Sequence, residues 1–133
     1  MDYVYGFTIL NDVTARDLQA NHGQWFHGKS LDTFCPMGPS CSCGTLRPIP
    51  LRSSPRSTAE VRQGRDDRTN LSYTIPQLIQ TLSQGTTLLP GDIIATGTPS
   101  GVRRRFNPPK FIHSGDVVEI SISDIGTLTN KVK

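Results

Sequence analysis

The sequence lacks long hydrophobic runs. No apolar stretch approaches the ~18 residues that a membrane-spanning helix needs, and Met1-Asp2-Tyr3 leads into an apolar segment with no basic targeting stretch before it. Hydrophobic residues make up only 35% of the 133 residues. We therefore expect a soluble protein of the cytoplasm or the mitochondrion, without a membrane partner.

Cysteine is also scarce. The three cysteines, Cys35, Cys41 and Cys43, form no C-x-x-C pair and have no histidine at zinc-site spacing, so free thiols in a reducing compartment are expected. The sequence contains no Gly-x-Ser-x-Gly nucleophile motif. None of the three histidines is selected as a general base by its spacing.

The formal net charge of +3 comes from one segment. Residues 40–68 contain six arginines and three acidic residues, which is the entire excess. The segment has no aromatic side chain that could stack on a nucleobase. A solvated loop is therefore favoured over a nucleic-acid-binding surface, and no nucleic-acid partner is expected.

Glycine and proline are abundant, with 12 and 10 residues respectively, which favours a turn-rich, β-rich α+β fold with short helices. The first half predicts a strand over 3–10 and a helix over 13–20, which Thr14 and Asp17 are expected to cap. Prolines recur between 32 and 58 and permit only short edge strands, so this stretch is predicted to be loop or disorder.

The second half of the sequence is more regular. Apolar residues at helical spacing begin at Ile75, and Pro76 suits the first turn of the predicted helix. A turn at residues 90–92 leads into a predicted strand over 92–96. Residues 117–122 alternate between apolar and polar, as in a half-buried strand, and 127–132 are a candidate last strand.

Asp12, Arg16 and Gln19 stand at positions i, i+4 and i+7. If a helix begins at Asp12, their side chains project along one face. A carboxylate suits a hard cation, a guanidinium fork suits a substrate carboxylate, and an amide can bond a carbonyl or enol oxygen. The alternative interpretation is an N-cap aspartate with an Asp12–Arg16 surface pair.

Residues 23–30 match the phosphate-binding pattern G-x-x-x-x-G-K-S. Such a loop follows a buried strand, whereas here a predicted helix comes first, so nucleotide binding is not favoured. Lys29 offers an ammonium group that can stabilise an enolate, with a solvated loop lysine as the alternative. The 97–101 turn can present a hydroxyl and backbone N–H groups to an anion, or be a generic tight turn.

Four sequence blocks together resemble the fumarylacetoacetate hydrolase (fumarylacetoacetase) family, namely the C-terminal half of its domain-containing members. They are GFTILNDVTARDLQ (6–19), GKSLDTFCPMGP (28–39), PGDIIATGTPSGV (90–102) and GDVVEI (115–120). The resemblance implies a mixed β-roll or sandwich and a Mg²⁺ ion, with Mn²⁺ or Ca²⁺ as alternatives. It also implies a homodimer in the complete family protein.

The resemblance implies chemistry on small 2-oxo or 1,3-dicarbonyl acids through an enolate. Family reactions are hydrolysis of acylpyruvates and fumarylacetoacetate, decarboxylation of oxaloacetate, and keto–enol tautomerisation. Asp12 matches the metal aspartate, and Arg16 and Gln19 match residues around the substrate and its activated water. The remaining matches are Lys29 and Thr33 near the ion and Thr98 at the substrate.

These matches lead to a spatial prediction. All of the matched residues except Thr33 are expected to converge on one pocket, because an enolate site needs a cation, a metal ligand and a hydroxyl close together. The strand over 3–10 is expected to adjoin the strand over 92–96. Lys29, Arg16 and Gln19 are the candidate catalytic residues.

The chain departs from the family pattern in two places. Family members carry a Glu-x-Glu metal pair and a His/Glu base pair upstream of the first strand, so the domain is expected to be incomplete at its N-terminus. Residues 40–68 stand where the family has a hairpin, which suggests a gene-model error, a degraded gene or an inserted loop. This segment is predicted to be the least ordered part.

Three functional hypotheses follow. The first is a family enzyme that is weakly active or inactive as this chain alone, with poor Mg²⁺ binding. The second is a non-catalytic member that acts as a binding or assembly subunit. The third is a P-loop nucleotide binder.

Overall fold

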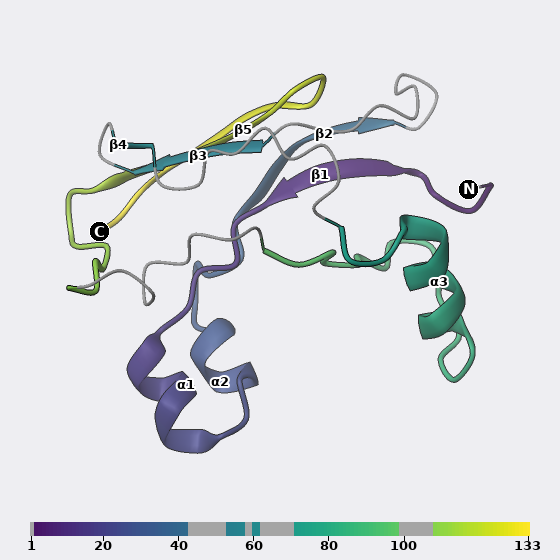
Figure 1. Cartoon of the computed structure of the whole chain (residues 1–133), viewed down its shortest axis with the longest axis horizontal. Helices are drawn as coiled ribbons and strands as arrows, with labels where there is room; N and C mark the ends of the chain where they lie inside the picture. The colour runs from purple at the N-terminus through teal and green to yellow at the C-terminus, as the bar shows by residue number, and fades with distance from the viewer. Residues whose placement is uncertain (1, 43–52, 58–59, 62–70, 99–107) are drawn as a thin grey trace.

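The computed structural model describes residues 2–42, 53–57, 60–61, 71–98 and 108–133. Within these ranges the strands form two antiparallel sheets, of two and four strands, and the helices are short. In Figure 1 the helices lie on one side of the paired sheets, with α1 and α2 together and α3 apart from them. This arrangement confirms the predicted β-rich α+β class with short helices.

The smaller sheet pairs β1 (Gly6–Leu10) with β2 (Met37–Ser42). The register shifts between Thr8 and Leu10, which marks a bulge. Pro39 lies inside β2 after a cis peptide bond, and the strand tolerates a residue without an N–H because each strand of a two-stranded sheet has a free edge. A strand therefore forms inside the stretch predicted as loop.

The larger sheet has the strand order β4-β3-β5-β6. Its strands are β3 (Ser53–Ser57), β4 (Glu60–Val61), β5 (Val117–Ile122) and β6 (Gly126–Lys131). The strands β5 and β6 confirm the predictions over 117–122 and 127–132. The short strand β4 pairs with Arg56 and Ser57 only, so among the residues that the structure describes no strand pairs with Pro55 on that edge of β3.

The prediction of loop or disorder over 32–58 was thus wrong for β2 and β3. Residues 53–57 form five pairs with β5, a partner far along the chain, and long-range pairing of this kind leaves no local signal in the sequence. The rest of the 40–68 segment, residues 43–52, 58–59 and 62–68, lies outside the described residues. Most of the prediction that the 40–68 segment is the least ordered part therefore concerns residues that the structure does not describe.

Helix α3 (Ile75–Ser83) forms as the sequence predicts. A capping box starts it: the Gln77 N–H donates to Thr74 Oγ1 at 3.4 Å, and the Thr74 N–H donates to Gln77 Oε1 at 2.8 Å. None of the helices in the described ranges is long and apolar enough to cross a membrane.

Helix α1 (Arg16–His22) begins three residues later than predicted. Its N-cap residue is Ala15, which makes no side-chain cap. The Thr14 hydroxyl donates instead to the Asp12 carbonyl at 3.2 Å. The predicted Thr14–Asp17 cap was therefore wrong, because this hydroxyl is used in the loop before the helix.

The turn at residues 90–92 is present. The Asp92 N–H donates to the Leu89 carbonyl at 3.1 Å, and its carboxylate accepts from the Leu89 N–H at 2.8 Å. Residues 92–98 then form no strand. The predicted adjacency of two strands over 3–10 and 92–96 was wrong, because the ladder partner of β1 is β2.

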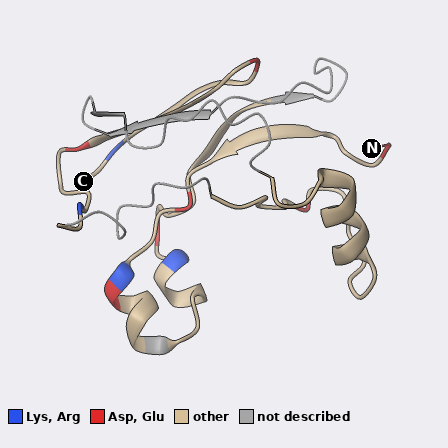
Figure 2. Ribbon diagram, viewed as in Figure 1, with Lys and Arg blue, Asp and Glu red and all other residues tan. Residues whose placement is uncertain are grey.

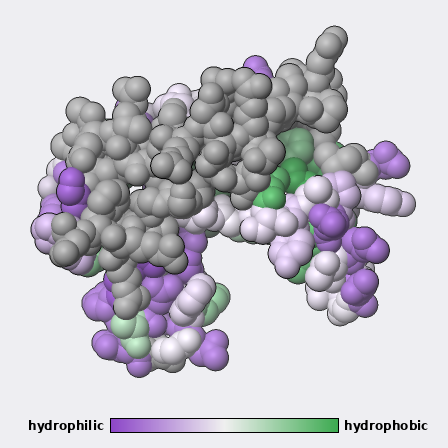
Figure 3. Space-filling model, in the orientation of Figure 1, coloured by the Kyte–Doolittle hydropathy of each residue, from purple (hydrophilic) through white to green (hydrophobic). Residues whose placement is uncertain are grey.

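The core lies where the two sheets meet. Ile9 of β1 is 1% exposed, and β2 packs against β6 so closely that a Cβ at Gly126 would lie 2.7 Å from Pro39 Cγ. Tyr3 and Tyr5, in contrast, are 98% and 92% exposed. The strand thus begins at Gly6, and the aromatic residues before it remain on the surface. Figure 3 shows a hydrophobic area of the surface, coloured green, beside α3.

Candidate functional site

Four of the predicted site residues lie on or beside the α1–α2 hairpin. The chain leaves β1, forms α1, turns at Gly23 with a left-handed φ of 64°, and returns in α2 (Phe26–Lys29). The Ala15 N–H donates to the Gly28 carbonyl at 2.8 Å, which ties the start of α1 to the end of α2. Figure 2 shows basic residues at the ends of both helices nearest the sheets.

Asp12 and Lys29 form an ion pair. Lys29 Nζ donates to Asp12 Oδ2, and the side chains are 27% and 40% exposed respectively. This pair replaces the Asp12–Arg16 surface pair that the sequence left open. Asp12 also lies ahead of α1 rather than in it, so the condition for a shared helix face, a helix that begins at Asp12, is not met.

The loop that carries Asp12 is hydrogen-bonded to the residue that directly precedes β2. The Asn11 N–H donates to the Pro36 carbonyl at 3.1 Å, and the Val13 N–H donates to the Asn11 carbonyl at 2.8 Å. These bonds fix the backbone on both sides of Asp12. The carboxylate is therefore presented at the end of a sheet strand, as the sequence reasoning expected of a cation ligand.

Arg16 and Gln19 form a second pair on α1. Arg16 Nη1 donates to Gln19 Oε1 at 2.9 Å, and Gln19 is only 8% exposed. A buried acceptor limits where the guanidinium can point. The Gln19 amide nitrogen remains able to donate to a substrate oxygen, and the Arg16 fork keeps its other N–H groups for a carboxylate.

Thr33 follows this hairpin in a strained backbone conformation. Its φ is 69°, and Cys35 two residues later has a φ of 56°. A β-branched residue rarely adopts this region, and such strain tends to occur at functional sites. Thr33 is exposed, and among the described residues no hydrogen bond joins it to Asp12 or Lys29. No feature of the sequence pattern indicates this strain.

Thr98 is exposed and adjoins residues 99–107, which lie outside the described ranges. Most of the 97–101 turn therefore cannot be placed beside the hairpin. The structure brings together Asp12 with Lys29 and Arg16 with Gln19. The convergence of all these residues with Thr98 on one pocket stays a prediction.

The G-x-x-x-x-G-K-S segment does not have the context of a phosphate-binding loop. Helix α1 precedes it, and the segment itself folds into α2. Gly28 is buried against α1, where an added Cβ would lie 2.9 Å from the Ala15 carbonyl oxygen. The glycine is thus used for helix packing, which the sequence reasoning missed.

Asp12 supplies one carboxylate as a possible metal ligand. The described part of the chain contains no group of three or more His, Cys, Asp and Glu side chains suited to a metal ion. Mg²⁺ is commonly held by one or two carboxylates together with waters and substrate oxygens. Asp12 fits the role of one such ligand. The described residues do not supply a complete set.

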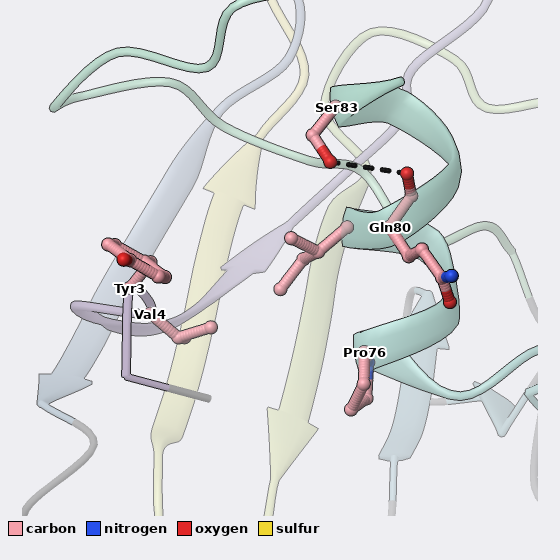
Figure 4. Close-up of a pocket in the computed structure, with 6 residues that line it drawn as sticks. Tyr3, Val4, Pro76, Gln80 and Ser83 are labelled. Atoms are coloured by element: carbon pink, nitrogen blue, oxygen red, sulfur yellow. Dashed lines mark hydrogen bonds between the residues drawn. The ribbon is translucent and has the colours of Figure 1, made fainter.

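A separate hollow of about 290 Å³ lies between the N-terminal segment and α3. Figure 4 shows Tyr3 and Val4 on one side and α3 on the other, with the Ser83 hydroxyl donating to the Gln80 carbonyl at 3.2 Å. Its lining residues are Tyr3, Val4, Pro76, Ile79, Gln80 and Ser83. None of the predicted site residues is among them.

Comparison with known proteins gives a consistent family. The family described as fumarylacetoacetate (FAA) hydrolase C-terminal matches residues 1–133. Oxaloacetate tautomerase YisK of Bacillus subtilis is 53% identical over 133 residues, which cover 98% of this chain and 44% of that protein.

Solved structures agree with the sequence comparison. A fumarylacetoacetate hydrolase from Exiguobacterium antarcticum has a TM-score of 0.86 and 44% identity, covering 99% of this chain and 48% of its own. A 5-carboxymethyl-2-hydroxymuconate delta-isomerase from Mycobacterium smegmatis has a TM-score of 0.85 and 43% identity, covering 98% and 49%. The chain thus spans about half the length of these relatives. It belongs to the fumarylacetoacetate hydrolase family and corresponds to the C-terminal domain of that family.

Proposed function

We propose that this chain carries the cationic side of a site that stabilises the enolate of a small 2-oxo or 1,3-dicarbonyl acid, of the oxaloacetate, acylpyruvate or fumarylacetoacetate type. The observation that carries the proposal is the Asp12–Lys29 ion pair on the same hairpin as the Arg16–Gln19 pair. The 53% identity to an oxaloacetate tautomerase supports the choice of substrate class.

The residues suit the charge changes of such a reaction. Removing a proton beside the oxo group of a 2-oxo acid leaves negative charge on the oxo oxygen. The Lys29 ammonium, with its side chain 27% exposed, can donate a hydrogen bond to that oxygen as the charge develops. Arg16 can bind the substrate carboxylate through its fork, while Gln19 orients Arg16 and donates to a substrate oxygen. No residue is assigned as general base.

Asp12 is proposed as one ligand of a Mg²⁺ ion, for which Mn²⁺ or Ca²⁺ could substitute, with the other positions filled by substrate oxygens, waters and further ligands. When bound, the ion would supply Lewis-acid stabilisation of the enolate oxygen. Asp12 would then have two cationic partners, the ion and Lys29, whose ammonium already pairs with it.

The second candidate is a non-catalytic member that binds a 2-oxo acid or assists assembly. The absence, among the described residues, of a group of three or more His, Cys, Asp and Glu side chains suited to a metal ion favours it, because a cation held by fewer carboxylates is bound more weakly. We therefore expect the 133-residue chain alone to bind Mg²⁺ poorly and to turn over oxaloacetate or acylpyruvate at the background rate.

Two proteins test these alternatives. The first is the chain alone, and the second is the chain fused to the part of the Bacillus subtilis relative that it does not match. Mg²⁺ titration calorimetry and an oxaloacetate or acylpyruvate assay are run on both. Turnover and Mg²⁺ binding only in the fusion support the proposed enzyme, whereas binding of oxaloacetate without turnover in the fusion supports the second candidate. Tight Mg²⁺ binding with Asp12-dependent turnover by the chain alone contradicts the expectation of an incomplete site.

A further inference from the structure

The buried glycine of α2 has no side chain, yet it packs against Gln19 of one pair of the candidate site and directly precedes Lys29 of the other. We infer that Gly28 is a positioning residue: its missing side chain lets α2 approach α1 closely enough to set the Asp12–Lys29 pair and the Arg16–Gln19 pair at once. This inference rests on the proposed function for its catalytic meaning, but its geometry is independent of any substrate.

The contacts of Gly28 are unusually close. A Cβ at this position would lie 2.9 Å from the Ala15 carbonyl oxygen and 2.9 Å from the Gln19 backbone nitrogen. It would also lie 3.1 Å from Gln19 Cβ. Two of these three atoms belong to the backbone of α1 or its cap, so a side-chain rotation cannot relieve the clash. Any larger residue must push the two helices apart.

The contact between Gly28 and α1 is linked to both pairs of the candidate site. On one side, Gly28 is followed directly by Lys29, whose ammonium pairs with Asp12. On the other side, Gly28 packs on Gln19, whose amide oxygen holds Arg16 at 2.9 Å. The 2.8 Å hydrogen bond from the Ala15 N–H to the Gly28 carbonyl fixes the contact in one register.

Glycine is otherwise a poor choice within a helix, because it loses more conformational freedom on folding than any other residue. Gly28 has no left-handed backbone angle that would require it. The close approach of the helices is therefore the physical reason for glycine at this position. This close approach also explains the glycine and lysine of the G-x-x-x-x-G-K-S pattern by a structural role rather than by nucleotide binding.

The test measures side-chain reactivity in the full chain, without metal or substrate. Lys29 acylation and Arg16 modification by phenylglyoxal are followed by mass spectrometry in wild type, Gly28→Ala, Asp12→Asn and Gly85→Ala. Lys131 and Lys133 serve as internal references. Gly85→Ala is the matched control, because Gly85 has open space around it and no left-handed angle.

The expected pattern separates positioning from simple loss of a partner. Asp12→Asn should speed the labelling of Lys29 alone, by about two- to fivefold, the equilibrium factor of a partly exposed ion pair. Gly28→Ala should speed the labelling of both Lys29 and Arg16, while Gly85→Ala changes neither. In the fusion protein, Gly28→Ala should also lower kcat, and it should add no further loss to Lys29→Met.

Hydrogen exchange over β5 and β6 decides between local and global effects. Unchanged protection there, with faster labelling on the hairpin, supports the positioning role. Loss of protection in β5 and β6 with Gly28→Ala would show that the glycine serves the whole fold and would overturn the inference, as would unchanged labelling of Arg16. Failure of the fusion to turn over any 2-oxo acid would overturn the proposed function alone, because the labelling pattern does not depend on it.

Discussion

The α1–α2 hairpin and the hollow beside α3 are opposite kinds of surface. The hairpin has a buried glycine and a buried glutamine, and three charged side chains lie on or beside it in two direct pairs. The hollow is a concavity of about 290 Å³, but its described lining has no charged residue and its Tyr3 is 98% exposed. The difference teaches that a concave shape alone does not identify the chemistry. Preorganised polar groups are the stronger indication.

The strongest test of this comparison is loss of charge on the hairpin. In the fusion protein, we expect Lys29→Met to lower kcat by about 10²–10³, because removing one preorganised donor to a developing oxyanion has effects of that size. Ser83→Ala in the hollow should leave kcat unchanged. Steady-state kinetics with oxaloacetate would check both variants. A larger loss from Ser83→Ala than from Lys29→Met would reverse the assignment of the two surfaces.

A smaller effect is expected from the second pair of the hairpin. Arg16→Lys keeps the charge but loses the planar fork and the bond to Gln19. We expect the KM for oxaloacetate to rise about tenfold, which corresponds to about 1.4 kcal/mol, near the lower end of the contribution of a hydrogen bond to a charged group. Lys131→Ala on β6 is the control for general charge effects. Equal changes in both variants would show that Arg16 acts only through net charge.

The same contrast explains which parts of the structure the sequence predicts. The helix over 75–83 is encoded locally, by Thr74, Pro76 and the spacing of apolar residues, and it forms as expected. The α1–α2 hairpin is also a local unit, but its key contact is the approach of two helices at Gly28. A pattern of residue types cannot reveal that contact, so the sequence predicts the charged residues of the site and misses the residue that positions them.

The sheets show a related limit. Alternation predicts β5, which pairs with β3 and β6 in the larger sheet, and the candidate last strand over 127–132 forms as β6. Prolines permitted only short edge strands between 32 and 58 and led to a prediction of loop or disorder, yet 37–42 and 53–57 both form strands. Pro39 and Pro55 are tolerated at edges whose position depends on the whole topology. The predicted strand over 92–96 failed for the converse reason, since suitable residues found no ladder partner.

The capping box of α3 should matter for stability and not for the site. Thr74→Ala removes the side-chain acceptor of the Gln77 N–H, and we expect the free energy of unfolding to fall by about 1 kcal/mol. Chemical denaturation of the chain would measure this change. Thr81→Ala, within the same helix, is the control. The labelling rate of Lys29 should be the same in wild type, Thr74→Ala and Thr81→Ala. A change in this rate with Thr74→Ala would show that α3 and the α1–α2 hairpin are coupled.

The smallest effect is expected at the rim of the hollow. Tyr3 is 98% exposed, so its ring loses little contact with the protein when it is removed. We expect Tyr3→Ala to change the free energy of unfolding by less than about 0.5 kcal/mol, as is usual for surface positions. Ile9→Ala, at the opposite extreme with 1% exposure, should cost about 2–5 kcal/mol in the same denaturation experiment. If Tyr3→Ala instead destabilised the chain by more than about 1 kcal/mol, or changed its mass in solution, the ring would have to be covered by another surface, since a side chain in water cannot contribute that much. The hollow would then be an interface, and its lack of charge would follow from that role.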